Sequence, residues 1–305
     1  MTKRFRYVGV LMGGTSRERE VSLRSGSAIA GGLRETGYIV DEIDVTSEEV
    51  PIPDAVEAVF LSLHGTFGED GCVQSILEER GIPYTGSGPE ASRVAFDKIA
   101  TKKVFERIGV PTPAYQVMRS GESREMPLPV VVKPPLQGSS IGLHCVFEEE
   151  SWEEASRDAL KYGETILVEE FIDGAELTVG IVCGELMPIV EIRAPTGHYD
   201  YEAKYESGET EYLVPAPIAP GLAEACSRMA AEADREMGCR GMTRIDFRLS
   251  SEGKLFALEV NTLPGFTQTS LLPKSAQAAG LEFPELCERI MESASTEGTL
   301  VKGDS

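Results

Sequence analysis

Strand-like and helix-like stretches alternate over the first 97 residues, and this order constrains the fold more than any other feature of the chain. The stretches are strand-like at residues 7–12, 39–45 and 58–63 and helix-like at residues 21–35 and 72–80. Strands that alternate with helices favour a parallel sheet covered by helices. We therefore expect an α/β unit over residues 1–97, ending inside a helix predicted over residues 90–108.

Beyond residue 114 the pattern is typical of α+β units. The predicted strands are 130–133, 165–171, 177–183, 186–193, 242–249 and 255–260, and the predicted helices are 152–162, 221–237, 271–279 and 284–292. Gly184-Glu185 is a two-residue hairpin signal. The polar, aromatic segment 195–211 is long for a loop, which favours a lid. Residues 293–305 are predicted to form a frayed tail.

The composition excludes several classes of function. The chain has 29 basic and 50 acidic side chains, so its formal charge is 29 − 50 = −21, which argues against a nucleic-acid partner. The sequence contains no run of 18 apolar residues and no signal-peptide cleavage pattern, so no membrane span is expected. The six cysteines are widely spaced without a C-x-x-C pair, which predicts reduced thiols in a cytoplasmic protein.

Two polar triplets carry the strongest chemical signal: Arg-Ile-Asp ending at Asp246 and Glu-Val-Asn starting at Glu259. Strand side chains alternate between faces, so a hairpin turn between the strands would place Asp246 opposite Glu259 and Arg244 opposite Asn261. Two carboxylates and an amide oxygen on one face suit magnesium better than zinc. The alternative is an exposed polar face bridged by Arg244.

A second signal combines Lys98 and Lys133 with the Gly/Ser segment 138–142. Lys133 ends an apolar strand, and a lysine beside a glycine-rich turn can meet phosphate oxygens that backbone N–H groups also bind. The sequence contains no Walker A motif, which excludes a P-loop NTPase. A surface lysine beside a flexible turn is the alternative interpretation.

The first predicted sheet offers a third candidate site. The segment 12–16 follows the first strand and precedes a helix, where an anion could rest on helix N–H groups, and Glu18 lies close by. His64 follows the 58–63 strand at the carboxyl edge, where open α/β sheets bind ligands. Two alternatives to ligand binding stay open: Glu18 would only complement the helix dipole, and His64 would have a structural role. Residues 86–91 match a dinucleotide fingerprint, but they follow a late strand and lack the downstream acid, so NAD binding is not expected.

Seven segments together resemble those of the ATP-grasp ligases, and most closely the D-alanine:D-alanine ligases. They keep the family's order, although residues 134–137 depart from its more polar form, which leaves the rigidity of that loop open. The segments are GGTSREREVS at 13–22, LHGTFGEDG at 63–71, YTGSG at 84–88, KP at 133–134 with GSSIG at 138–142, YDYEAKY at 199–205, RID at 244–246 and EVNTLPG at 259–265.

The resemblance implies a fold of mixed α/β and α+β class. It comprises an N-terminal Rossmann-like domain (1–97) and a two-domain ATP-grasp fold, with a central domain (98–173) and a C-terminal domain (174–305) that carries the lid 195–211. The implied reaction joins two D-alanines through an acyl phosphate, converts ATP to ADP and phosphate, and serves peptidoglycan synthesis in the cytoplasm. A homodimer is also implied, without nucleic-acid or membrane partners.

The resemblance also implies residue roles. Asp246, Glu259 and Asn261 would bind two Mg²⁺ ions, with Mn²⁺ as a possible substitute. Glu18, Ser139 and Tyr205 would form a hydrogen-bonded set that closes the site. The implied ATP-binding residues are Lys98, Lys133, Ser140, Glu169, Glu170, Phe171, Ile172, Glu176, Lys204 and Phe247. The implied substrate-binding and oxyanion-stabilising residues are Glu18, Ser22, His64, Arg244, Gly265, Ser270 and Leu271.

Two other functions stay open at this point. One is a related ATP-grasp ligase that makes D-alanyl-D-lactate or D-alanyl-D-serine, although Tyr205 is absent from the depsipeptide ligases and its presence favours D-alanine. The other is a catalytically silent nucleotide-binding or regulatory protein. The complete set of candidate lysines and metal ligands argues against that second function.

Overall fold

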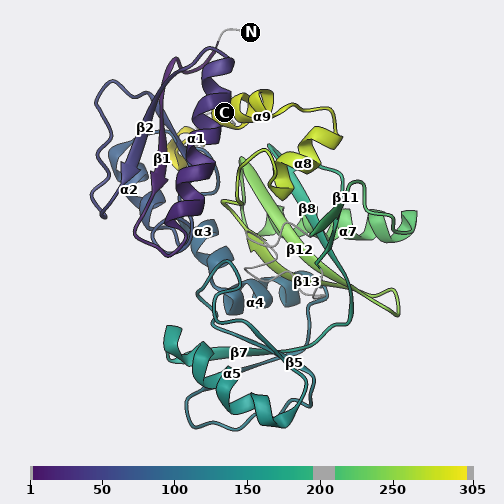
Figure 1. Ribbon diagram of the computed structural model, residues 1–305. Helices are drawn as coiled ribbons and strands as arrows, with labels where there is room; N and C mark the ends of the chain where they lie inside the picture. The colour runs from purple at the N-terminus through teal and green to yellow at the C-terminus, as the bar shows by residue number, and fades with distance from the viewer. Residues whose placement is uncertain (1–2, 195–209, 301–305) are drawn as a thin grey trace.

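The N-terminal part of the chain forms the expected parallel sheet. The computed structural model describes residues 3–194 and 210–300. Strand β1 (Tyr7–Gly13) lies between β2 (Ile39–Val45) and β3 (Ala58–Leu61), and both pairings are parallel. Helices α1 (Arg19–Glu35) and α2 (Cys72–Arg80) follow β1 and β3 (Figure 1). Strand β3 is two residues shorter than predicted, so His64 lies in the loop beyond its carboxyl end.

The single helix predicted over residues 90–108 is wrong. The structure has two helices, α3 (Pro89–Phe96) and α4 (Lys98–Ile108), separated by Asp97 in an extended conformation. The Asp97 side chain accepts hydrogen bonds from the backbone N–H groups of Ile99 and Ala100, at 2.9 and 3.2 Å. Asp97 is therefore the N-cap of a new helix, and Lys98 becomes the first residue of that helix.

The central part of the chain is a four-stranded antiparallel sheet. Its order is β4-β7-β5-β6, and helix α5 follows β6 along the chain. The bounds are β4 (Tyr115–Arg119), β5 (Val130–Lys133), β6 (His144–Val146), α5 (Trp152–Ala159) and β7 (Thr165–Glu170). Lys133 ends its strand as predicted, and the last turn of the predicted helix 152–162 is a 3-10 helix.

A six-stranded antiparallel sheet forms the C-terminal part. Its order is β11-β10-β8-β12-β13, with β9 also paired to β8. The bounds are β8 (Gly174–Val182), β9 (Glu185–Leu186), β10 (Val190–Arg193), β11 (Glu211–Leu213), α7 (Pro220–Glu236), β12 (Met242–Ser250), β13 (Leu255–Asn261), α8 (Leu271–Ala278), α9 (Phe283–Glu292) and α10 (Glu297–Leu300). The strand predicted at 186–193 is interrupted, because Pro188 has no N–H to donate to a ladder.

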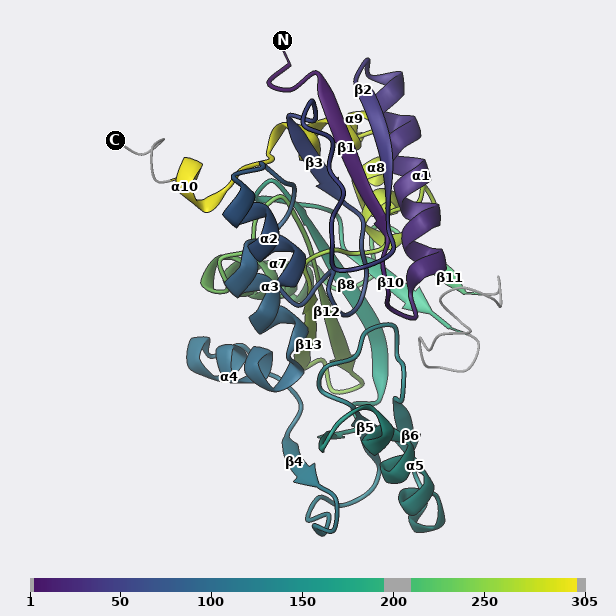
Figure 2. The same ribbon diagram turned by 90° about the vertical axis from the view of Figure 1, so that its left-hand side faces the viewer.

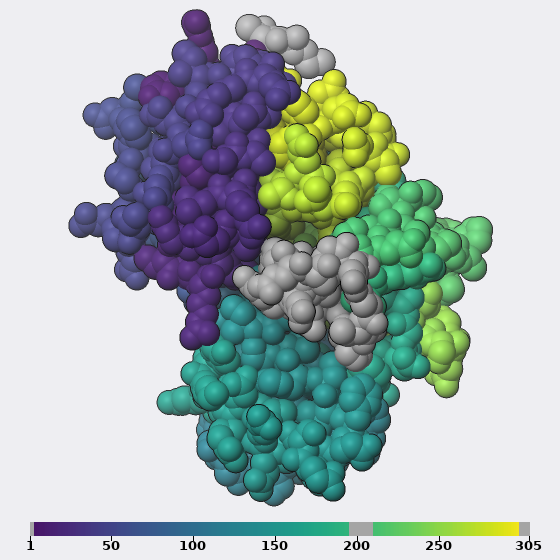
Figure 3. Space-filling view, in the orientation of Figure 1, coloured from purple at the N-terminus to yellow at the C-terminus, as the bar shows by residue number. Residues whose placement is uncertain are grey.

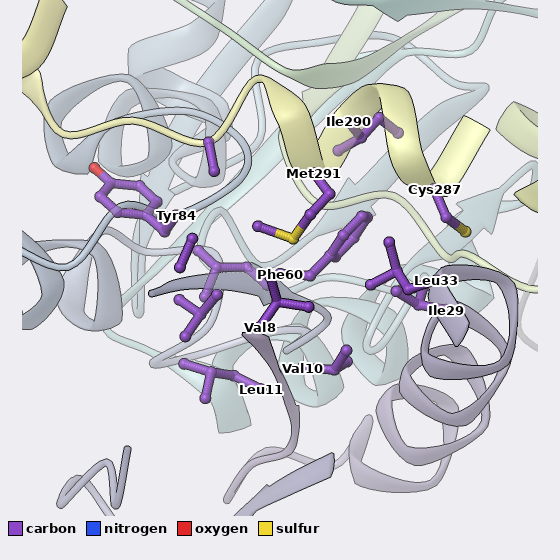
Figure 4. Packing of buried hydrophobic residues seen from close by; sticks show 14 of the residues in the cluster. Val8, Val10, Leu11, Ile29, Leu33, Phe60, Tyr84, Cys287, Ile290 and Met291 are labelled. Carbon is purple, nitrogen blue, oxygen red and sulfur yellow. The ribbon is translucent and has the colours of Figure 1, made fainter. Parts of the chain in front are cut away.

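Helix α9 completes the hydrophobic core of the N-terminal sheet. Ile290 and Met291 are fully buried together with Val8 and Phe60, and α9 lies beside α1 (Figures 1, 2 and 4). Burial of each such side chain contributes roughly 1.5–3 kcal/mol. The prediction of a frayed tail from residue 293 is wrong for its first residues, because Ser295 pairs with Tyr84 and is buried.

None of the described helices is long and apolar enough to cross a membrane. The segment expected to form a lid, 195–211, lies outside the described residues except for its last two. Lys204 and Tyr205 lie outside them as well.

Candidate active site

A cavity of about 230 Å³ lies where the three parts of the chain meet. Figure 3 shows the N-terminal part in purple, the central part in teal and the C-terminal part in green to yellow. The predicted site residues that line the cavity are Glu18, His64, Lys98, Ser139, Arg244, Glu259, Asn261, Gly265, Ser270 and Leu271. The fold therefore brings together residues that are more than two hundred positions apart in the chain.

Glu18 and Ser139 join two parts of the chain across the cavity. The Ser139 hydroxyl donates a hydrogen bond to Oε1 of Glu18, which is buried just before helix α1. Ser139 and Ser140 both adopt left-handed backbone conformations, with φ of 49° and 58°. Such φ values are strained for residues other than glycine and are concentrated at functional sites.

His64 presents an unpaired acceptor within this cavity. Its Nδ1 lies 3.1 Å from the carbonyl oxygen of Leu263, so Nδ1 must carry the proton. Burial lowers the pKa of the ring, which is therefore neutral at neutral pH, and Nε2 is left as an acceptor. Nε2 is buried and has no hydrogen-bond partner among the described residues.

Glu69 is a site residue that the sequence analysis missed. It lines the cavity and accepts a 2.6 Å hydrogen bond from the backbone N–H of Gly65. Burial and the negative charge of Glu18 raise the pKa of Glu69 to about 8. The sequence did contain a signal for Glu69, because this residue belongs to the same glycine-rich segment, 63–71, as His64.

The strand pairing predicted for the candidate metal ligands is confirmed. Strands β12 and β13 pair Asp246 with Glu259 and Arg244 with Asn261. The Asn261 amide lies 3.0 Å from Asp246, and Arg244 contacts both carboxylate oxygens of Asp246, at 2.9 and 2.8 Å. Two carboxylates and an amide fit a hard divalent cation, which would replace the hydrogen bonds they now make. The described part of the chain contains no cluster of three His, Cys, Asp or Glu ligands, so the candidate set depends on Asn261 as its third ligand.

Lys98 lies beside the strand face that carries Asp246 and Glu259. Its Nζ lies 3.0 Å from Oε2 of Glu259 and 2.9 Å from the carbonyl oxygen of Gln137. Burial is the largest influence on the pKa of Lys98 and lowers it, but the negative charge and hydrogen bond of Glu259, together with the charges of Glu169 and Glu69, outweigh burial and raise the pKa. Lys98 is therefore a permanent positive charge at the cavity, and Asp97 positions it by capping α4.

A second cavity, of about 110 Å³, lies between the central and C-terminal sheets. Its lining includes Lys133, Ser140, Glu169, Glu170, Phe171, Ile172, Glu176, Asp246 and Glu259. Glu176 is paired with Arg248 at 3.3 Å. The Glu169 carboxylate lies between Lys133 at 2.5 Å and Lys102 at 2.7 Å. Lys102 was not predicted, although it lies four residues after Lys98 and so on the same helix face.

Comparisons with known proteins agree with these features. Family models described as the N-terminus and C-terminus of D-ala D-ala ligase match residues 44–87 and 104–292. A D-alanine–D-alanine ligase of Syntrophotalea carbinolica is 46% identical over 293 residues, covering 94% of this chain and 96% of that protein. The corresponding ligase of Desulforudis audaxviator is 46% identical over 302 residues, covering 95% and 98%. The chain belongs to the D-alanine–D-alanine ligase family.

Solved structures of the D-alanine–D-alanine ligase family share the fold. A ligase from Bacillus anthracis, in a structure complexed with ATP, matches with a TM-score of 0.84 and 30% identity, covering 98% of this chain and all of that chain. A second structure of the Bacillus anthracis ligase gives a TM-score of 0.85 and 32% identity. The three-part architecture expected from the sequence is therefore the architecture of a ligase of this family.

Two residues expected to line the ligase site lie elsewhere. Ser22 is fully buried, accepts a hydrogen bond from the Gly13 N–H and donates one to the Ser62 carbonyl, so it fixes the turn after β1. Phe247 is buried in the hydrophobic core beneath β12 and lines neither cavity. The register of β12 and β13 shifts between Asp246 and Phe247, an irregularity that alternation alone does not predict.

Proposed function

We propose that this chain is an ATP-dependent ligase that joins two D-alanines into D-alanyl-D-alanine, a peptidoglycan precursor. One observation carries the proposal: Glu259 lines both cavities. The smaller cavity would hold the nucleotide and the larger cavity the amino acids. The two spaces therefore meet at a candidate metal ligand, where a phosphoryl group would pass from ATP to a carboxylate.

We assign the nucleotide to the cavity lined by Lys133 and residues 169–172. Lys133 and Lys98 would neutralise its phosphate oxygens, and Glu176 would bind the ribose. Phosphoryl transfer depends mainly on positioning and charge neutralisation, and these lysines supply both. When bound, two Mg²⁺ ions held by Asp246, Glu259 and Asn261 would neutralise the charge of the phosphates, and Mn²⁺ could replace them.

The first D-alanine would lie between the N-terminal sheet and the Gly/Ser loop. Its ammonium group would bind the Glu18 carboxylate and the free acceptor Nε2 of His64. Its carboxylate oxygen would attack the γ-phosphorus of ATP, releasing ADP and leaving an acyl phosphate. The Ser139–Glu18 hydrogen bond would hold the loop closed over this substrate and exclude water from the intermediate.

The second D-alanine would lie at the start of helix α8. Ser270 is the N-cap of this helix, and the helix N-terminus attracts the carboxylate of that substrate. Its amine, once deprotonated, would attack the carbonyl carbon of the acyl phosphate, and phosphate would leave as the amide bond forms. Arg244 and the Gly265 N–H would stabilise the oxyanion.

The remaining features of the proposal rest on the family resemblance. We assign residues 1–97, 98–173 and 174–305 to three domains, and residues 195–211 to a lid that carries Lys204 and Tyr205. Tyr205 would complete the hydrogen-bonded set with Glu18 and Ser139. We also propose a homodimer that works in the cytoplasm, where ATP is available.

A phosphate-release assay tests the proposed function. The purified chain is supplied with ATP, Mg²⁺ and D-alanine, alone or with D-serine or D-lactate as the second substrate. The proposal expects D-alanine alone to support ADP and phosphate release with formation of the dipeptide. Release that required D-lactate or D-serine would assign a different ligase specificity. ATP binding without any turnover would instead indicate a silent nucleotide-binding protein.

A further inference from the structure

Lys102 lies behind the proposed nucleotide cavity and does not line it. Its side chain is fully buried, and its ammonium group has three partners: Oε1 of Glu169 at 2.7 Å, the Thr112 hydroxyl at 2.7 Å and the Pro113 carbonyl at 3.2 Å. The contact with Glu169 is an ion pair, the other two contacts are hydrogen bonds, and all three lie inside the protein. Lys102 cannot reach a nucleotide directly.

Glu169 connects Lys102 to the cavity. Lys102 contacts one oxygen of its carboxylate and Lys133 contacts the other, at 2.5 Å. Lys133 does line the cavity. The three side chains form a buried row that runs from helix α4, through strand β7, to the end of strand β5.

The row contains unequal numbers of positive and negative charges. Around the same site, Lys98 contacts Glu259, Arg244 contacts Asp246 and Arg248 contacts Glu176. In the row, two ammonium groups surround one carboxylate and leave one net positive charge. Without Lys102, the Glu169 carboxylate would neutralise Lys133.

We propose that Lys102 is a positioning residue for ATP, which acts by neutralising Glu169 so that the charge of Lys133 is available to the phosphates. The inference rests on the proposed function, since it takes the smaller cavity to be the nucleotide site. In a buried row the charge interactions are weakly screened, so a group that does not touch the ligand can still change its affinity. Lys102 also fixes the carboxylate in place through its own bonds to Thr112 and Pro113.

The test measures the dissociation constant of ATP by calorimetry in the absence of D-alanine. Lys102→Met keeps the length of the side chain and removes its charge. We expect it to weaken ATP binding about tenfold or more, since tenfold corresponds to roughly 1.4 kcal/mol, and to flatten the salt dependence of the affinity. The KM for D-alanine should change little. Lys103→Met is the matched control, because Lys103 is exposed on the same helix and its loss changes the total charge equally.

The double variant Lys102→Met with Glu169→Gln separates charge from structure. Because Glu169 itself lines the cavity, Glu169→Gln is also measured alone. The proposal expects Lys102→Met to weaken ATP binding much less in the Glu169→Gln background than in the wild type. An equal loss in both backgrounds would overturn the proposal, as would an unchanged affinity in Lys102→Met. Lys102→Gln repeats the charge removal with a side chain that can still bond Pro113. Loss of folding in both single variants would assign Lys102 to stability and also overturn the proposal.

The wild-type chain in the same experiment keeps the two proposals apart. A wild-type chain that bound no ATP would contradict the proposed function itself. Tight ATP binding by the wild type, together with wild-type affinity in Lys102→Met, would contradict only the role of Lys102.

Discussion

The hydroxyl of Ser139 donates a hydrogen bond to the carboxylate of Glu18, and this contact closes the larger cavity on one side. One partner precedes the first helix of the N-terminal part, and the other lies in the Gly/Ser loop of the central part. The bond therefore couples the position of the Gly/Ser loop to the residue assigned to the ammonium group of the first D-alanine.

Ser139→Ala should raise the KM for D-alanine more than the KM for ATP. A hydrogen bond to a charged group contributes roughly 1.5–3 kcal/mol, so the loss in kcat/KM for D-alanine should be about 10- to 100-fold. Steady-state kinetics with each substrate varied in turn measures this. Ser27→Ala, at an exposed hydroxyl of α1, is the control. A larger effect on ATP than on D-alanine would contradict the assignment.

Glu259→Gln should abolish turnover without unfolding the protein. The amide keeps the size of the side chain but loses the charge that a divalent cation needs, and a loss of about 1,000-fold in kcat corresponds to roughly 4 kcal/mol. Thermal unfolding should change little. ADP production by the wild type should also cease when a chelator removes divalent cations. Glu252→Gln, at an exposed carboxylate of the hairpin turn, is the control. Near-normal turnover in Glu259→Gln would refute the metal assignment.

His64 should remain neutral as the pH falls through the range in which an ordinary imidazole titrates. Burial lowers its pKa, so the unfolded chain binds a proton near pH 6.5 before the folded chain does, and this group makes stability fall as the pH drops below about 6.5. NMR titration should show no His64 transition near that value. His64→Leu should remove this contribution to acid destabilisation and raise the KM for D-alanine about tenfold. A His64 transition near pH 6.5 would contradict the assignment of this ring as a neutral hydrogen-bond acceptor.

Glu69→Gln should remove a loss of stability that occurs as the pH rises, whereas His64 causes a loss of stability as the pH falls. The folded-state pKa of Glu69 is about 8, well above its ordinary value of 4.5, so the folded protein holds a proton that the unfolded chain has lost. Stability therefore falls as the pH rises through that window. Glutamine mimics the protonated acid, so the Tm of the variant should exceed that of the wild type increasingly from about pH 5 to about pH 9. If the Tm values of the variant and the wild type changed with pH in parallel, the Glu69 carboxyl would be ionised over the whole pH range, which would contradict its raised pKa.

Local patterns predicted the part of the site that depends on local geometry. Alternation along β12 and β13, with a turn between them, was enough to place Asp246 opposite Glu259. The break at Asp97 was missed, because a helical pattern continues through a residue whose side chain caps the next helix. Lys102 and Glu69 were missed for another reason. Their environment comes from charges and burial supplied by distant segments, which no local pattern records.

The participation of α9 in the first sheet's core determines when that core can form during protein synthesis. Ile290, Met291 and Ala294 are synthesised more than two hundred residues after Val8 and Phe60, yet they cover these two residues. A nascent chain of the first hundred residues therefore carries an uncovered apolar face. The core of the first sheet is therefore completed only after helix α9 has been synthesised.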